Sequence, residues 1–269
     1  MKKIESAVNP KIKLAAQLAK RSSREKNGLF IAEGVRLAEM AAASDWRIAY
    51  ALVTERAAGE ARVQAILAQL VERNVDVFLV NERVYDKASG TETPQGVLLV
   101  VEQKRWTLDA LRGMTPCFVV LDRVQDPGNL GTILRTADAA GMDGMILLKG
   151  TVDVFSPKVV RAAMGSLFHV PVVSDVTEEA FLSFAAGQQL TCYATALDAT
   201  AKPHFEASFH GATAIVFGNE GHGVSQGILE RAEKIYIPMY GKAESLNVAV
   251  SSAIVLYEVV RQRHTAISG

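Results

Sequence analysis

The sequence predicts an α/β protein of two domains, and three observations support this prediction. Short apolar runs that suit buried strands alternate with helical patterns along nearly the whole chain, as in sheets covered by helices. The 269 residues are enough for two modest domains. A charged stretch with few apolar runs, residues 103–115, separates two such series and is typical of a linker. We therefore expect a smaller N-terminal α/β domain at 1–102 and a second domain at 116–269.

The first domain is expected to begin with a helix and to continue as four strands. Pro10 begins a helical pattern whose apolar stripe lies among lysines, and Asn27-Gly28 ends it. Later elements follow from apolar runs and turn residues: strands at 29–34, 47–53, 75–80 and 96–102, and helices at 34–43 and 61–73.

The second domain repeats the alternation with more strands. The continuous apolar run Cys117–Asp122 is typical of a strand buried in a parallel sheet. Ser156 is expected to cap a helix that has Pro157 at its first position. The remaining elements are predicted from the same patterns: strands at 144–149, 169–173, 190–197, 212–218 and 234–239, and helices at 133–141, 156–168, 177–186 and 245–263.

Composition excludes several classes of protein. The formal net charge is zero, so total charge says nothing about a polyanionic partner. Cys117 and Cys192 lie in apolar runs far apart, which favours small buried hydrophobes in a reducing compartment. Histidines and cysteines form no cluster that predicts a metal site, and no apolar run is long enough for a signal peptide or a membrane span. We expect a protein of the cytoplasm without a metal ion.

Basic residues gather at the N-terminus. Residues 1–28 hold eight basic and two acidic side chains. Such an excess is the electrostatic footprint of a partner with a phosphate backbone, although a solvated helix face gives the same pattern, and charge alone does not separate the two. If the partner is a nucleic acid, the expected contacts are Lys11, Lys13, Lys20, Arg21, Arg24 and Lys26.

Three loops of the second domain follow strands, where ligands bind in open α/β sheets. The first, at 119–141, places Asn129 near a helix start, and Arg135 lies less than two turns further on. The alternative is that Asp126 and Asn129 only cap the helix and that Arg135 forms an ion pair. The loop lacks the glycine fingerprint of nicotinamide-binding proteins, which argues against a dehydrogenase.

The other two loops are at 215–225 and 236–258. The former holds three glycines and one carboxylate, Glu220, which either orients a ligand or only charges a helix start. We assign no role to His222. In the latter, Pro238 ends a strand, and Ser245 with Asn247 starts a slim apolar helix. The alternative for this segment is a buried C-terminal helix that is capped by Ser245 and has no part in a binding site.

Taken together, the three segments resemble the SpoU/TrmH family of RNA ribose 2′-O-methyltransferases. The first family motif carries an Asn and, six residues later, an Arg, which match Asn129 and Arg135. A Gly-x-Glu-Gly core matches residues 218–221, and the Ile-Pro-Met and Ser-Leu-Asn strings match residues 237–239 and 245–247. The resemblance is sharpest over residues 117–263. It extends more loosely to the N-terminal part, which resembles the family's substrate-binding domain.

The resemblance implies a fold and a cofactor. It implies a mostly parallel sheet with helices on both faces and a deep trefoil knot, and homodimers that use the C-terminal helix. It also implies an S-adenosylmethionine site, and the residues that would bind the cofactor are Thr195, Ala196, Leu197, Gly218, Asn219, Glu220, Ile237, Pro238, Met239, Ser245 and Leu246.

The implied reaction moves a methyl group to a ribose 2′-hydroxyl of structured RNA. Family members with similar motifs act on both ribosomal and transfer RNA, and of the two we expect ribosomal RNA. The catalytic set carried over by the motifs is Arg135, Asn129, Glu220, Ser245 and Asn247. Because a guanidinium keeps its proton in proteins, we expect Arg135 to bind a phosphate of the RNA and to stabilise negative charge rather than to act as a base. An alternative is an RNA-binding or assembly factor that retains the fold without catalysis.

Overall fold

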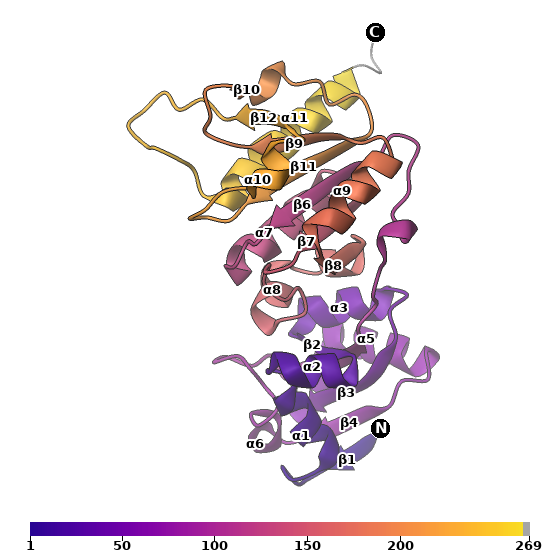
Figure 1. Ribbon diagram of the computed structural model, residues 1–269. Helices are drawn as coiled ribbons and strands as arrows, with labels where there is room; N and C mark the ends of the chain where they lie inside the picture. The colour runs from indigo at the N-terminus through magenta and orange to yellow at the C-terminus, as the bar shows by residue number, and fades with distance from the viewer. Residues whose placement is uncertain (266–269) are drawn as a thin grey trace. The chain divides into compact units, whose positions relative to one another are not determined.

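The computed structural model describes residues 1–265, and the chain divides into two compact units. The first consists of Met1–Lys104 and Asp153–His169, and the second consists of Arg105–Val152 and the described chain from Val170 onward. The segment Asp153–His169, which follows β7 and includes α8 in Figure 1, belongs to the first unit although it comes later in the chain. The boundary between residues 104 and 105 lies at the expected linker, whereas the excursion of Asp153–His169 has no counterpart in the sequence-based boundaries.

The first unit is built on a five-stranded sheet in the order β1-β4-β3-β5-β2. β5 runs antiparallel to both of its neighbours, and the other pairs are parallel. The expected strands are present, and the edge strand β1 was not predicted because three residues are too short for a periodic pattern. In chain order the elements are β1 (Lys2–Ile4), α1 (Pro10–Gln17), α2 (Arg21–Asn27), β2 (Leu29–Glu33), α3 (Val35–Ala43), β3 (Ile48–Thr54), α4 (Glu55–Ala58), α5 (Ala61–Glu72), β4 (Val77–Val80), α6 (Glu82–Tyr85), β5 (Val97–Glu102), α8 (Pro157–Ala162) and the 3-10 turn η2 (Ser166–Phe168).

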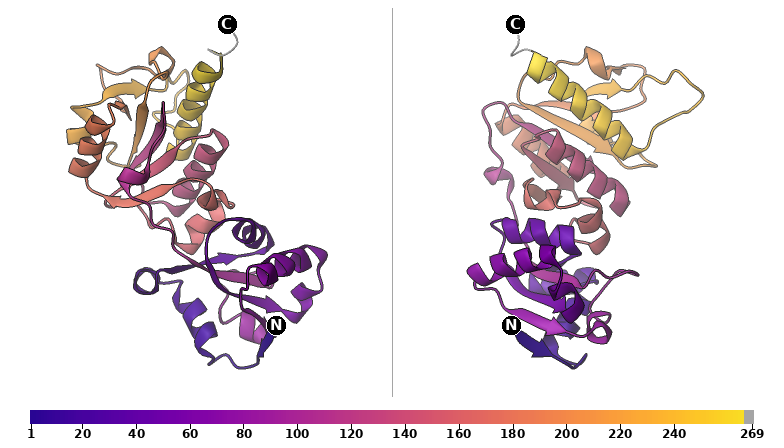
Figure 2. Two further views of the ribbon diagram at one scale, coloured as in Figure 1. Left: turned by 90° about the vertical axis from the view of Figure 1, so that its right-hand side faces the viewer. Right: turned by 180° about the vertical axis from the view of Figure 1, so that it is seen from behind.

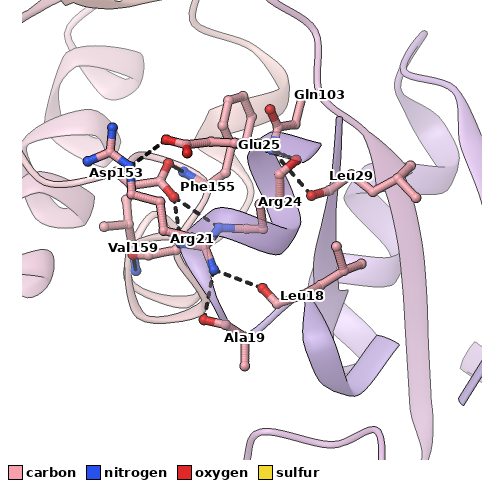
Figure 3. A network of polar contacts seen from close by, with 11 residues as sticks. Leu18, Ala19, Arg21, Arg24, Glu25, Leu29, Gln103, Asp153, Phe155 and Val159 are labelled. Carbon is pink, nitrogen blue, oxygen red and sulfur yellow. Dashed lines mark hydrogen bonds and ion pairs between the residues drawn. The ribbon is translucent and has the colours of Figure 1, made fainter. Parts of the chain in front are cut away.

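The N-terminal helix is divided in two, where the sequence predicts one helix from Pro10 to Asn27. Lys20 adopts an extended conformation between α1 and α2. The carbonyls of Leu18 and Ala19 each accept a hydrogen bond of 2.8 Å from the guanidinium of Arg24. Figure 3 shows this guanidinium between those carbonyls and Asp153, whose carboxylate lies 2.5 Å from Nη2 of Arg24. The break is therefore stabilised by a buried arginine.

Aromatic rings explain why Asp153–His169 belongs to the first unit. Phe155 and Phe168 pack against Phe30 and Trp46, with ring centroids 5.1–6.3 Å apart. The hydroxyl of Ser156 caps α8 as expected, but the predicted helix at 156–168 ends early because the backbone turns into the left-handed region at residues 164 and 165.

The second unit is built on a seven-stranded sheet in the order β10-β12-β9-β11-β6-β7-β8, and all of its strand pairs are parallel. The short elements β10 and α10 were not predicted, and β8 begins three residues later than expected. In chain order the elements are η1 (Leu108–Ala110), β6 (Cys117–Asp122), α7 (Pro127–Ala139), β7 (Gly144–Leu148), β8 (Val172–Val176), α9 (Glu178–Gly187), β9 (Thr191–Thr195), β10 (Lys202–Pro203), η3 (His204–Glu206), β11 (Thr213–Gly218), α10 (Gln226–Leu229), β12 (Glu233–Tyr236) and α11 (Val248–Thr265).

Helices cover both faces of this sheet. Phe118 and Val120 of β6 pack in one core cluster with Phe181 of α9 and Ile228 of α10. The two views of Figure 2 show α7 and α11 side by side on the opposite face, in agreement with their many mutual contacts. The predicted α/β class, with a parallel sheet between helices, is confirmed. The passage of α11 through a knot stays a prediction.

Both cysteines are free thiols, Cys117 in β6 and Cys192 in β9. Burial raises the pKa of Cys117 to about 12 and that of Cys192 to about 11, so both thiols stay protonated at neutral pH. Within residues 1–265, no helix combines the length and the hydrophobicity that crossing a bilayer requires.

Candidate active site

A cavity of about 700 Å³ opens at the carboxyl ends of β9, β11 and β12. This is the edge at which ligands bind in parallel α/β sheets, and the volume lies within the roughly 300–1,000 Å³ typical of small-molecule sites. The lining residues come from three strand ends and from the start of α11: Thr195, Ala196, Leu197, Asp198, Phe217, Gly218, Asn219, Glu220, His222, Gly223, Val224, Leu229, Ile235, Tyr236, Ile237, Met239, Glu244, Ser245, Leu246, Asn247, Val248 and Ser251.

The charges around the cavity suit a cationic ligand. Asp198, Glu220 and Glu244 line it, and among its described lining residues none is lysine or arginine. Hydrogen bonds from the Lys234 ammonium and from Thr200 hold the pKa of Asp198 well below its usual range, so this carboxylate stays ionised. The Asp198 carboxylate is already paired with the Lys234 ammonium, whereas Glu220 and Glu244 line the cavity as further carboxylates. Such a lining fits S-adenosylmethionine, whose sulfur carries a positive charge.

A chain of hydrogen bonds joins the three motif segments beside this cavity. Nδ2 of Asn247 donates to Oδ1 of Asn129 at 3.0 Å, and Nδ2 of Asn129 donates to Oε1 of Glu220 at 2.9 Å. These side chains come from segments 91 and 118 residues apart in sequence. The direction of donation is consistent throughout, because the chain ends on a carboxylate that can only accept.

The two asparagines are held by the starts of two helices. Asp126 caps α7 by accepting from the backbone N–H of Asn129 at 2.8 Å, so the Asn129 side chain is left for the chain described above. Oδ1 of Asn247 accepts from the N–H of Ala249 at 2.9 Å and caps α11. The side-chain oxygen of Asn247 therefore caps the helix, and its nitrogen donates to Asn129. Asn129 does more than cap a helix, which was the alternative for this residue.

The loop that carries Glu220 is tightly folded. Asn219 and Gly223 exchange backbone hydrogen bonds of 3.1 and 2.9 Å across it. A Cβ atom at Gly218 would lie only 2.1 Å from the carbonyl carbon of Gly223, so a side chain there would force the loop open. Glycine at position 218 is thus required by close packing of the backbone.

The residues expected to bind the cofactor gather around the cavity, apart from Pro238. Asn129 is hydrogen-bonded to Glu220, which lines the cavity, and Ser245 and Asn247 also line it. Arg135 lies apart: it is exposed on α7 and is not among the lining residues. Within the described chain its guanidinium has no hydrogen-bond or ion-pair partner.

Most of the basic side chains that were expected to contact a phosphate backbone face solvent, but Arg24 does not. Lys13, Lys20 and Lys26 are exposed, as is Arg21, whose Nε lies 2.7 Å from Glu25. The ammonium of Lys11 lies over the rings of Tyr50 and Phe78. Arg24 is only 3% exposed and is bound to Asp153. Its guanidinium therefore stabilises the fold and does not face a phosphate backbone.

Sequence reasoning missed several lining residues. Val224, Leu229 and Ile235 carry apolar patterns that are indistinguishable from ordinary core. Asp198 follows the end of β9, and that place at a strand end was the available signal. Among the described residues, no group of three or more His, Cys, Asp or Glu is placed to hold a metal ion.

Two family models match the chain. Residues 116–257 match the SpoU rRNA Methylase family, and residues 9–99 match the MRM3-like substrate binding domain. The first match covers the strands, loops and helices that form the cavity described above.

Curated relatives align over nearly the whole chain. The chain is 38% identical over 260 residues to the 23S rRNA (guanosine(2553)-2'-O)-methyltransferase RlmP of Bacillus subtilis, covering 96% of this chain and 99% of the relative. It is 31% identical over 257 residues to the 23S rRNA (uridine(2479)-2'-O)-methyltransferase of Streptomyces viridochromogenes, covering 92% and 88%.

Solved structures agree with this relationship. A crystal structure of AdoMet-bound rRNA methyltransferase from Sinorhizobium meliloti superimposes with a TM-score of 0.87 at 34% identity, covering 97% of each chain. The SpoU methyltransferase AviRb from Streptomyces viridochromogenes gives a TM-score of 0.86 at 28% identity, covering 96% of this chain and 99% of that one.

Proposed function

The chain belongs to the SpoU rRNA Methylase family of S-adenosylmethionine-dependent RNA 2′-O-methyltransferases, and we propose that it methylates one ribose of the large-subunit ribosomal RNA. The observation that supports this most directly is the chain of hydrogen bonds from Asn247 through Asn129 to Glu220, beside a cavity whose charges suit a sulfonium.

The coverage of the relatives favours ribosomal RNA as the substrate. Two relatives that align with both units are named as 23S rRNA methyltransferases, and a third is named as a tRNA/rRNA methyltransferase. A tRNA-modifying TrmH/SpoU enzyme from A. aeolicus covers 58% of this chain. The match to a substrate-binding domain over residues 9–99 indicates that the additional unit selects the RNA.

We assign the binding of the cofactor to the loops at 215–225 and 236–258 and to the end of β9. The backbone from Gly218 to Glu220, Ile237, Met239 and Leu246 would surround it, together with residues 195–197, and Pro238 would hold the strand end between Ile237 and Met239. When bound, S-adenosylmethionine supplies a methyl group that is already activated by the charge on sulfur. The protein therefore has to align the ribose oxygen with this group and to favour loss of the hydroxyl proton.

Arg135 supplies the positive charge in this scheme. Its guanidinium binds a phosphate of the RNA and stabilises negative charge that develops on the 2′-oxygen. Asn129, Glu220, Ser245 and Asn247 hold the loops and orient the ribose, because their polar groups already point at one another or into the cavity.

A homodimer would bring Arg135 to a site that it does not reach in its own chain. Arg135 lies on α7, which packs along α11. Val250 and Tyr257 on α11 are 49% and 51% exposed, so this helix presents apolar surface that a partner subunit would cover. We propose that these helices form the face between two copies, and that Arg135 completes the cavity of the partner subunit.

For RNA binding we propose the exposed and half-exposed basic side chains of α1 and α2 and their surroundings, with Arg24 removed from the set. These are Lys11, Lys13, Lys20, Arg21 and Lys26, together with Arg135 in the second unit.

The test is methyl transfer by the purified protein. Ribosomal and transfer RNA from a strain without the gene are incubated with methyl-labelled S-adenosylmethionine and digested to nucleosides. We expect label in a single 2′-O-methylnucleoside of the 23S fraction. Label in the base, label only in transfer RNA, or tight RNA binding without transfer and without cofactor binding would contradict the proposal. The last result would favour a non-catalytic assembly factor.

A further inference from the structure

Asp122 of β6 contacts both ends of the Glu220 loop, with its backbone at one end and its buried carboxylate at the other. Asp122 is the last residue of β6 and is 2% exposed. Its register partner on the neighbouring strand β11 is Gly218, where the loop begins. Where the loop ends, the backbone N–H of Ser225 donates to Oδ2 of Asp122 at 2.6 Å. One residue therefore holds the loop where it leaves the sheet and where it returns.

The next residue fixes the middle of the loop. Arg123 has a φ of +59°, in the left-handed region that non-glycine residues rarely occupy. In this conformation its carbonyl accepts from Nδ2 of Asn219 at 2.8 Å. Oδ1 of Asn219 in turn accepts from the N–H groups of Gly221 and His222 at 2.9 and 3.0 Å. The backbone turn after β6 thus determines the position of the loop's tip, beside Glu220.

The Arg123 guanidinium neutralises the same carboxylate. Its Nε donates to Oδ1 of Asp122 at 2.8 Å, and this hydrogen bond raises the pKa of Arg123. The pair explains how a buried charge is tolerated here, since buried carboxylates need a partner and hydrogen bonds. Neither Asp122 nor Arg123 lines the cavity, so their influence on a ligand has to pass through the loop.

We propose that Asp122, with the main chain of Arg123, is a positioning residue that holds the 218–225 loop in its cofactor-binding conformation. The loop contributes Gly218, Asn219 and Glu220 to the cavity, and Glu220 receives the hydrogen bond from Asn129. A loop held before the ligand arrives loses less conformational entropy when the ligand binds. The proposal rests on the proposed function, because the cofactor is the ligand whose affinity it affects.

The experiment measures the affinity for S-adenosylhomocysteine, the demethylated cofactor, by calorimetry on the full chain. Asp122→Ala should weaken this affinity roughly ten- to a hundredfold, as expected when binding groups are misplaced. Asp122→Asn keeps an acceptor oxygen for the Ser225 N–H and should recover most of the affinity. RNA affinity should change little in both variants, and the KM for S-adenosylmethionine should rise more than the KM for RNA.

Asp143 offers a control at the other end of the same strand, where an exposed carboxylate bonds the backbone. Its Oδ2 accepts from the backbone N–H of Cys117, the first residue of β6, at 2.7 Å. Asp143→Ala removes an equivalent bond between a carboxylate and the backbone, but it lies far along the strand from the loop. This variant should lower thermal stability without weakening cofactor binding, which separates positioning from a general loss of stability.

A second pair of variants tests the same bond from the loop side if Asp122→Ala does not fold. Ser225 has a φ of −62°, which proline adopts, so Ser225→Pro removes the N–H donor. Ser225→Ala removes only the hydroxyl, which donates to Glu178. We expect weaker cofactor binding for the proline variant alone.

Two results would overturn the positioning role: wild-type affinity in both Asp122→Ala and Ser225→Pro, or an equal loss in Asp143→Ala. Failure of the wild-type protein to bind S-adenosylhomocysteine would instead overturn the proposed function.

Discussion

Arg135 and Asn129 lie six residues apart on one helix, yet the structure gives them different surroundings. Asn129 is bonded to Asn247 and Glu220, whereas Arg135 is exposed and outside the cavity. The sequence motifs had placed both residues in one catalytic set. The difference is explained if Arg135 acts across an interface between two copies, where its charge meets the RNA at the partner's cavity.

The substitution Arg135→Lys tests the role of the guanidinium. Lysine keeps the charge but lacks the planar fork that binds a phosphate through two hydrogen bonds. We expect turnover to fall on the order of a hundredfold, comparable to the loss of one group that stabilises an oxyanion. Arg231→Lys, at an exposed arginine whose Nη1 donates to the Gly227 carbonyl, is the control and should leave turnover unchanged.

Mixed dimers show in which subunit Arg135 acts. Subunits with Arg135→Ala are mixed with subunits with Asn129→Ala, each inactive alone. If Arg135 completes the partner's site, random pairing restores about a quarter of wild-type activity, since half of the dimers then hold one intact site. Near wild-type turnover of Arg135→Lys with unchanged RNA affinity would refute both roles of this residue.

At this scale the sequence predicts residue types better than their partners. Asn129, Glu220 and Asn247 were identified from motifs, and the structure brings them together. Their hydrogen bonds were not predictable, because they join segments 91 and 118 residues apart. Arg24 was misassigned because a basic residue near lysines has the same sequence signal whether it faces solvent or, as here, is buried against Asp153.

At the scale of elements, strands were predicted more reliably than helix boundaries. Apolar runs such as Cys117–Asp122 are buried from end to end, so the apolar pattern in the sequence matches the burial in the structure. The break between α1 and α2 was missed because it depends on a side chain that caps carbonyls of the preceding helix. The early end of α8 was not predicted, because no strong helix breaker precedes Gly165, where the backbone turns into the left-handed region.

The helices α1 and α2 carry the proposed RNA contacts, and substitution of Lys13, Lys20 and Lys26 by serine tests them. Each phosphate contact adds close to one unit to the salt dependence of binding. The triple variant should therefore bind RNA more weakly, with a slope of log affinity against log salt that is flatter by roughly two to three units. The measurement is a titration of RNA binding between low and physiological salt.

Arg24→Ala serves as the contrasting variant within the same helices. It leaves the partly exposed Asp153 without the buried guanidinium and should lower the free energy of unfolding by about 3 kcal/mol. The triple lysine variant should unfold like the wild type, because its side chains are exposed. A salt slope that is unchanged in the triple variant would remove these lysines from the RNA interface.

For the whole molecule, the class of reaction follows from the second unit, and we propose that the choice of RNA depends on the first. The parallel sheet brings three loops to one edge, and the family model covers all of them. The order of the strands was not predictable from sequence patterns, because non-consecutive strands pair in both sheets. The division at residue 104 was anticipated by composition, but the transfer of Asp153–His169 to the first unit depends on ring packing that only the fold shows.

The most direct test of the central claim is a map of ribose methylation across total RNA. It compares the parent strain, a strain that lacks this gene, and the latter complemented with the wild-type or the Asn129→Ala gene. We predict that one ribose of the large-subunit RNA loses its methyl group in the deletion strain, and that only the wild-type gene restores it. A map that is unchanged by the deletion, or one that changes only in transfer RNA, would contradict the account.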